Sequence, residues 1–250
     1  MSDGDHVQAS GRIVSGLFGD WFDAPGWSFG VMLRTPQSVA LPGPHARRLV
    51  GIDLDAMDDP YELDGVREGH ASLRGQLVNG VLRVTQQLPY GQFVSAPWSA
   101  WTSPPCQPPP EGWPLDALSD EPHIDLESED LPGFVNVTIF RPTPTQSVYV
   151  VAATEPEGVD RVLRARIGAR LCVTPSVFTR DDIDRATTEL ERHRQDWGLD
   201  SILHSSDESG QAIVVITLPV VTQEIAEQLS RQPQGLIQAR PWLMPVAAHP

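Results

Sequence analysis

The residues of this sequence best suited to covalent chemistry are its two cysteines, Cys106 and Cys172. Cys106 lies in an irregular, proline-rich segment where a thiol can be exposed, and a nucleophilic thiol needs a nearby base. His45, His70 and His123 are candidate bases, and none stands at a spacing that fixes it beside Cys106. One interpretation of Cys106 is therefore a catalytic nucleophile, and the other is a small apolar side chain that holds its segment in place. Cys172 lies in an apolar run, and we expect a buried, inert strand residue there.

Two acidic stretches offer the carboxylates that hard cations such as Ca²⁺ and Mg²⁺ prefer. Neither has the spacing of an EF-hand loop or its glycine at the sharp turn, and acidic runs near turns are usually solvated. Zinc is also disfavoured, because no cysteines or histidines stand in paired ligand spacing. We expect no metal or cofactor, and the weak candidates for a cation site are Asp53, Asp55, Asp58 and Asp59, and then Asp125, Glu127, Glu129 and Asp130.

Motifs typical of common enzyme classes are missing from the sequence. It contains no G-x-S-x-G elbow, no G-x-x-x-x-G-K-[ST] phosphate loop and no G-x-G-x-x-G following a predicted strand. All 18 basic residues are arginines, so chemistry that requires a lysine, such as a Schiff base, is excluded. The sequence therefore favours a protein that is not an enzyme.

Cys106 belongs to the most distinctive segment of the chain, residues 97–114, which we call the strap. It holds seven prolines and three tryptophans, and proline fixes φ and removes a backbone donor, which favours an extended path. A flexible linker would be rich in glycine and serine, whereas Trp98, Trp101 and Trp113 offer large apolar surfaces that prefer to be covered. We expect a stiff connector that fixes the orientation of two flanking domains, with a ligand or partner groove beside its tryptophans.

The charge composition limits the possible partners. The chain carries 33 acidic residues and a net charge of −15, which argues against binding nucleic acid or an anionic membrane. Between Glu111 and Gln146 there are eight acids and a single arginine, Arg141. This distribution favours a basic protein or a small ligand as the partner.

The sequence predicts a cytoplasmic protein. No apolar run approaches the roughly 18 residues that span a bilayer, and the N-terminus has no signal-peptide pattern. Two cysteines allow at most one bridge, and their positions do not suggest a disulfide framework.

The part of the chain before the strap is strand-and-turn in character. Short apolar runs at 12–18, 27–34 and 49–54 are bounded by turn residues. Asn79-Gly80 predicts a type I′ hairpin between strands 71–78 and 81–87, with Leu77 opposite Leu82, Gly75 opposite Val84 and Leu73 opposite Gln86. Residues 1–96 are therefore expected to form a small β-barrel or sandwich.

The part after the strap and its acidic loop (97–131) contains both predicted strands and predicted helices. Strands are predicted at 134–140, 146–152, 171–174, 201–206, 211–218 and 236–240, and helices at 156–167, from Thr179 to Gly198, and at 223–230. From Leu171 onward this order is βαββαβ, the ferredoxin-like arrangement. The predicted fold class is therefore α+β, with a ferredoxin-like domain and extra strands at 132–250.

Several short motifs resemble those of a group of uncharacterised actinobacterial proteins. The matching residues are Gly75, Gly80, Leu82, Val84, Thr85, Pro105-Cys106, Pro108 to Pro110, Gly112-Trp113, Asn136-Val137 and Leu171-Cys172-Val173. The resemblance covers most of the chain after about residue 40 and implies the architecture without a known activity. A Cys-Gly pair of the group near residues 47–51 is replaced here by Arg47-Arg48-Leu49-Val50-Gly51, so a cysteine at that place is absent as a partner for the strap cysteine.

Three hypotheses about function follow from the sequence. The first is a non-catalytic protein that binds a protein or small ligand. The second is a hydrolase or thiol enzyme that depends on Cys106. The third is an acidic protein that neutralises a basic partner, and it rests on charge alone.

Overall fold

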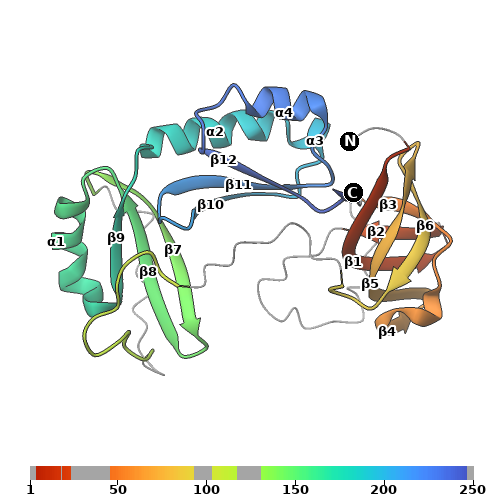
Figure 1. Cartoon of the computed structure of the whole chain (residues 1–250), viewed down its shortest axis with the longest axis horizontal. Helices are drawn as coiled ribbons and strands as arrows, with labels where there is room; N and C mark the ends of the chain where they lie inside the picture. Colours follow the sequence, from red (N-terminus) through yellow and green to blue (C-terminus); the bar gives the residue numbers. More distant parts are fainter. Residues whose placement is uncertain (1–3, 18, 24–45, 93–102, 117–130, 247–250) are drawn as a thin grey trace.

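The computed structural model describes residues 4–17, 19–23, 46–92, 103–116 and 131–246. These residues form an elongated α+β molecule with three groups of elements (Figure 1). The N-terminal strands lie at one end, a three-stranded sheet covered by helices lies in the middle, and a second three-stranded sheet with one helix lies at the other end. The predicted strand at 27–34 falls outside the described residues.

The N-terminal strands form a barrel, one of the two arrangements expected from the sequence. They are β1 (His6–Gly16), β2 (Gly19–Asp23), β3 (Arg47–Val50), β4 (Asp58–Leu63), β5 (Val66–Val78) and β6 (Val81–Leu88), with the short helix η1 (Leu54–Ala56) before β4. Because β1 pairs with both β2 and β5, the ring β1-β2-β3-β6-β5 closes, and β4 pairs with β5 beside it. Closure leaves no unpaired edge in the ring. Its apolar interior includes Val7, Ile13, Phe22, Leu73 and Leu82.

The predicted hairpin is confirmed at its turn and altered farther along. Asn79 and Gly80 both have positive φ, 51° and 74°, as a type I′ turn requires. Leu77 pairs with Leu82 as predicted, but the register shifts by one beyond Gly75, so Leu73 pairs with Gln87 and not with Gln86. A Cβ on Gly75 would lie 2.2 Å from the carbonyl oxygen of Arg83. The close approach of two backbones at this bulge therefore requires glycine.

The C-terminal part consists of two ββαβ units with the same topology. The first contains β7 (Phe134–Thr143), β8 (Gln146–Ala153), α1 (Pro156–Ile167) and β9 (Leu171–Pro175), and the second contains β10 (Ser201–Ser206), β11 (Ala212–Leu218), α4 (Gln223–Leu229) and β12 (Ile237–Pro241). A short 3₁₀ helix, η2 (Gly168–Arg170), precedes β9. In each unit the first two strands are antiparallel and the third runs parallel to the second.

The predicted elements from Leu171 onward are present, but the ferredoxin-like sheet is not confirmed. β9 pairs with β8 in the first sheet, and β12 pairs directly with β11 in the second. The apolar run of β8 makes it a buried central strand, and α1 is the crossover that returns the chain beside it. β9 therefore pairs with β8, which precedes Leu171, and the strands from Leu171 onward do not form one ferredoxin-like sheet.

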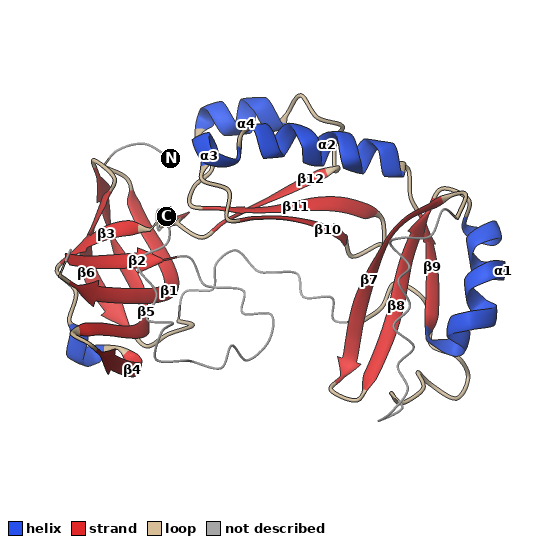
Figure 2. Cartoon of the chain, turned by 180° about the vertical axis from the view of Figure 1, so that it is seen from behind, coloured by secondary structure: helices blue, strands red, loops and turns tan. Residues whose placement is uncertain are grey.

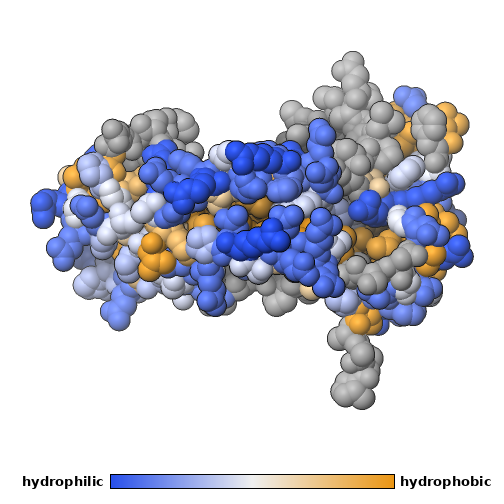
Figure 3. All heavy atoms as spheres, turned by 90° about the horizontal axis from the view of Figure 1, so that it is seen from above, coloured by the Kyte–Doolittle hydropathy of each residue, from blue (hydrophilic) through white to orange (hydrophobic). Residues whose placement is uncertain are grey.

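The helices begin where the sequence predicts, but the single helix expected from Thr179 to Gly198 is divided at His193 into two helices. α1 buries Val159, Leu163 and Ile167 against the first sheet. α2 (Arg180–Arg192) begins with a capping box between Thr179 and Asp182, and it is followed by α3 (Arg194–Trp197) and by Gly198 in the left-handed region. Figure 3 shows that the outer side of α2 and α4 is hydrophilic, as expected for helices whose apolar stripes face a sheet.

The two ββαβ units meet where the end of β10 reaches β7, the corresponding first strand of the other unit (Figure 2). The amide nitrogen of Asn136 donates to the carbonyl oxygen of Ser205 at 2.5 Å, and the Thr138 and Ser206 hydroxyls lie 3.2 Å apart. These side-chain hydrogen bonds join two sheets that share no ladder.

The C-terminal segment returns to the barrel, a contact that no local pattern in the sequence predicts. β13 (Met244–Pro245) pairs with β1, and Trp242 and Leu243 pack in the barrel core. The indole N–H of Trp242 donates to the Asp200 carboxylate at 2.8 Å, and its backbone N–H donates to the carbonyl of Leu218 at 3.0 Å. Trp242 thus links the barrel to the middle sheet.

No helix formed by the described residues has both the length and the apolar character that a bilayer crossing requires.

Candidate functional site: a groove beside the strap

The described part of the strap, residues 103–114, lies on the β7–β9 sheet opposite α1. Successive strand residues point to opposite faces, so Tyr149 and Val151 face α1 while Val148 and Val150 face away from it. Cys106 and Trp113 of the strap pack against Val148 and Val150. The sheet is therefore covered by a helix on one face and by the strap on the other.

A disulfide fixes the strap to β9. Cys106 is bonded to Cys172, which lies 66 residues away in the sequence, with their Cα atoms 5.7 Å apart. Cys172 is buried, as predicted, with 1% of its surface exposed, and Cys106 is partly exposed. The pairing itself was not predicted, because neither spacing nor local pattern indicates which strand lies beneath the strap. Neither sulfur is a free thiol in this structure.

A second attachment lies two residues beyond the strap, at Asp116. Its carboxylate accepts hydrogen bonds from the Ser147 backbone N–H and hydroxyl, both at 2.9 Å, and from Arg170 at 3.4 Å. Partial burial raises the pKa of Asp116, but these hydrogen bonds and the nearby charge of Arg141 outweigh it and hold the pKa below its ordinary value. The charged carboxylate is therefore the favoured form in the folded protein.

The backbone of the strap is anchored near the same place. The Gln146 side-chain amide donates to the carbonyl oxygen of Trp113 at 2.5 Å, and the Asp116 N–H donates to the carbonyl of Thr145 at 2.8 Å. Both sheet residues lie at the turn between β7 and β8 or just after it. The strap is thus held covalently at Cys106 and by hydrogen bonds at Trp113 and Asp116.

A groove of about 500 Å³ lies between the strap and α1 at the β9 edge of the sheet. This volume is within the range of small-molecule sites, about 300–1,000 Å³. The groove is lined by Cys106, Gln107, Pro109 and Trp113 of the strap, Asp160 and Arg164 of α1, Gly168 and Ala169 of η2, and Leu171 and Val173 of β9.

The β9 edge supplies backbone groups to this groove. β9 is the outer strand of its sheet, and the Ser176 N–H donates to Ala153, which indicates that alternate residues of β9 point toward β8. Leu171 and Val173 therefore direct their backbone groups outward. The N–H of Leu171 donates to Gly168 and its carbonyl accepts from Arg164 at 3.2 Å. Val173 is thus the β9 residue whose N–H and C=O are directed toward the groove.

Arg164 is held in one place at the groove. Its guanidinium forms an ion pair with Asp160, one helical turn earlier, and donates to the carbonyls of Leu171 and Gly168. Because several acceptors share this guanidinium, its position is fixed before any ligand arrives. The groove combines an apolar wall, an outward backbone pair and an ordered cation.

The predicted site residues are only partly brought together. Cys106 and Trp113 both line the groove, whereas Trp98, Trp101, His45, His123, Asp125 and Glu127, with Glu129 and Asp130, lie outside the described residues. His70 lies on β5 of the barrel and contacts Tyr90, and Cys106 belongs to the other end of the molecule.

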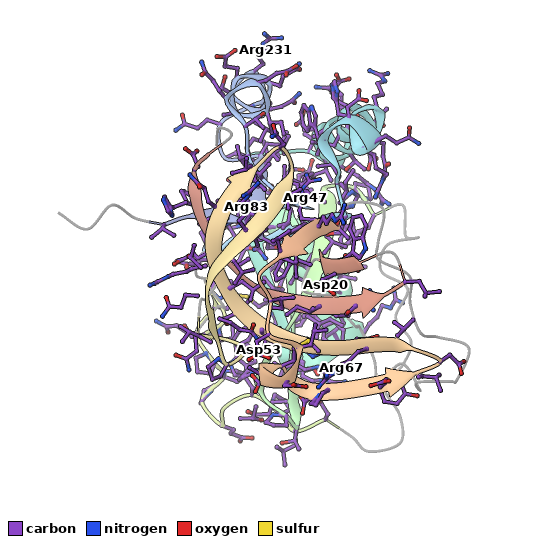
Figure 4. The ribbon with its side chains drawn as sticks, turned by 90° about the vertical axis from the view of Figure 1, so that its right-hand side faces the viewer. Asp20, Arg47, Asp53, Arg67, Arg83 and Arg231 are labelled. Carbon is purple, nitrogen blue, oxygen red and sulfur yellow. A yellow bond between two sulfur atoms is a disulfide. The ribbon has the colours of Figure 1, made fainter. Side chains whose placement is uncertain are left out.

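The first acidic stretch has a structural role in the barrel. Asp53 caps η1 by accepting the N–H of Asp55, and Asp55 pairs with Arg67 at 2.8 Å. Figure 4 shows Asp53 and Arg67 near the same end of the barrel. Within the described ranges, no three His, Cys, Asp or Glu side chains are grouped closely enough to hold a metal ion.

Sequence reasoning missed Arg164 and Val173, which carry no motif and enter the groove only because β9 is the edge strand. No protein family, curated protein or solved structure matches this chain.

Proposed function

We propose that this protein acts by binding, without catalysis of its own, and that a short extended segment of a partner protein enters the groove between the strap and α1. The observation that carries this proposal is the attachment of the groove's strap wall at Cys106, Trp113 and Asp116. A wall fixed in advance reduces the entropy lost on binding, which is how preorganised sites gain affinity.

The chemistry of the groove supports a peptide. An extended chain can pair its backbone with the outward N–H and C=O of Val173, as in β-strand addition. An apolar side chain of the partner can then cover Trp113 and Pro109, which line the opposite wall.

The net charge of −15 supports a partner that carries basic residues around this segment. This combines the acidic-protein hypothesis with the groove, because long-range attraction guides the encounter and the groove provides the specific contacts. Added salt should then slow association far more than it speeds dissociation.

The thiol-enzyme hypothesis has a structural condition. A Cys106 nucleophile requires the bridge to Cys172 to be opened first. The cytoplasmic location stays a prediction, and in a reducing cytosol the same bridge would be exposed to reduction.

The experiment is selection of short random peptides on the immobilised oxidised protein, followed by affinity measurements with the Trp113→Ala variant. Aromatic residues at the centre of an interface often account for much of the affinity, so we expect the selected peptides to bind this variant roughly tenfold or more weakly. The control is Tyr61→Ala, which removes an exposed aromatic ring from the barrel and should leave the affinity unchanged. Peptides that bind Trp113→Ala as tightly as the natural protein would refute the groove as the site. Enrichment of no peptide, with small neutral compounds bound instead, would refute the peptide as the ligand.

A further inference from the structure

The two ends of the described strap are held by different kinds of bond. Residues 103–109 are held to the sheet by the Cys106–Cys172 bridge and by the packing of Cys106 on Val148 and Val150. The sulfur of Cys106 lies 3.9 Å from the carbonyl oxygen of Val173. A bridged sulfur has no proton to donate, so this approach is not a hydrogen bond. Near residue 114, by contrast, hydrogen bonds to Trp113 and Asp116 involve no sulfur.

The two sulfurs also differ in access from solvent. Cys106 is partly exposed and lines the groove, whereas Cys172 is 1% exposed and packs with Val148 and Val150. Thiol–disulfide exchange depends on which sulfur an incoming thiolate can reach. A reductant that enters the groove therefore meets the sulfur of Cys106 first.

From this asymmetry we propose that the Cys106–Cys172 bridge is a redox latch: its reduction in the folded protein releases residues 103–109 from the β9 edge and remodels the groove. The co-reactant is a dithiol. One thiolate of the dithiol attacks the sulfur of Cys106, forms a mixed disulfide and displaces Cys172, which takes up a proton. The second thiol of the dithiol then displaces Cys106, which is protonated in turn, so the protein gains two electrons and two protons while the dithiol becomes a disulfide.

The released segment keeps its attachment at the other end. The hydrogen bonds to Trp113 and Asp116 are unaffected by reduction, so the strap pivots near Gly112 while α1 and β8 stay in place. Gly112 has φ 79°, a conformation that glycine adopts without strain, and its N–H closes a turn on Pro109. The latch goes beyond the proposed binding function, because it operates whether or not a peptide enters the groove.

The test is a titration of the folded protein with dithiothreitol, in which newly formed thiols are labelled with a light maleimide and the remainder with a heavy maleimide after denaturation. We expect both thiols to form while far-UV circular dichroism is unchanged. Cys106 should be labelled at about the rate of an exposed thiol and Cys172 at least about tenfold more slowly, because Cys172 becomes accessible only through local opening. The exposed reference is Val177→Cys in a Cys106→Ser/Cys172→Ser background, since Val177 is 77% exposed.

Hydrogen exchange compares the oxidised protein with the Cys106→Ser/Cys172→Ser variant, which cannot form the bridge. Faster exchange confined to the strap and β9, with β8 and α1 unchanged, is the expected result. The latch is refuted if the bridge resists reduction until the protein unfolds. Simultaneous labelling of both cysteines with loss of the circular dichroism signal, or identical exchange in the two forms, would refute it equally.

Discussion

Two segments attach one part of this molecule to another, and they do so by different means. The strap lies on the surface of the first ββαβ unit, where it is tied by a disulfide and a few polar contacts and packs through Cys106 and Trp113. The C-terminal segment instead inserts Trp242 and Leu243 into the barrel core and adds β13 to β1. The disulfide borders a groove and can be opened by a reductant, whereas the insertion of Trp242 and Leu243 into a core has no such switch. The strap can therefore form the wall of a binding site, whereas the C-terminal segment with Trp242 and Leu243, which we call the joint, stabilises the contact between the barrel and the middle sheet.

The largest effect is expected from removing the joint. Trp242→Ala should lower the free energy of unfolding by about 3–5 kcal/mol, because it leaves a large cavity between the barrel and the middle sheet and removes the hydrogen bond to Asp200. Urea denaturation measures this loss. Hydrogen exchange should become faster in β1 and β2 of the barrel than in the β7–β9 sheet. An equal loss of protection in β8 would contradict the distinction between the two segments.

The next effect concerns the bridge. Cys106→Ser/Cys172→Ser should cost about 2–4 kcal/mol, because the bridge closes a loop of 66 residues that restricts the unfolded chain. The same urea titration gives the value. Hydrogen exchange should become faster in the strap and β9 and stay unchanged in the barrel. Faster exchange in β1 would contradict the distinction between the two segments.

A smaller effect is expected at the polar anchor. Asp116→Ala should cost about 1–3 kcal/mol, since it leaves the backbone N–H of Ser147 and part of the Arg170 guanidinium without their acceptor. Thermal unfolding of the bridged protein measures it. The control is Glu111→Ala, five residues earlier, because Glu111 is exposed and no loss of stability is expected there.

The smallest effect is the pH dependence of this anchor. Hydrogen bonds lower the pKa of Asp116 in the folded protein, so its contribution is fully present above the pKa of the unfolded chain, near 3.8, and is lost as the pH falls through the lower folded value. The stability difference between the natural protein and Asp116→Asn should therefore shrink in strong acid. A difference that stays constant from neutral pH to below the folded pKa would show that the charge of Asp116 is not what holds the strap.

Local signals in the sequence predicted most of the elements. Asn79-Gly80 predicted the hairpin turn, Thr179 predicted the start of α2, the alternation at 134–140 predicted β7, and the apolar run at 146–152 predicted β8. Each of these depends on a few neighbouring residues, which is why a single sequence contains it.

Long-range pairing was what the sequence did not contain. The choice of β9 between two sheets depends on the burial that β8 offers, and the return of Trp242 to the barrel depends on where β12 ends in space. The same is true of the site: Cys106 and Trp113 were recognised by type, but their meeting with Arg164 and Val173 results from the position of β9 at the edge.

The most direct test of the strap as a fixed wall is peptide mapping of the purified protein by mass spectrometry, with free thiols alkylated first and digestion by trypsin carried out without a reductant. The tryptic peptide Leu171–Arg180, which contains Cys172, should be found only in covalent linkage with the peptide that contains Cys106, and reduction should separate the two. Recovery of Leu171–Arg180 as an unlinked peptide with an alkylated thiol, from protein kept under oxidising conditions, would contradict this account.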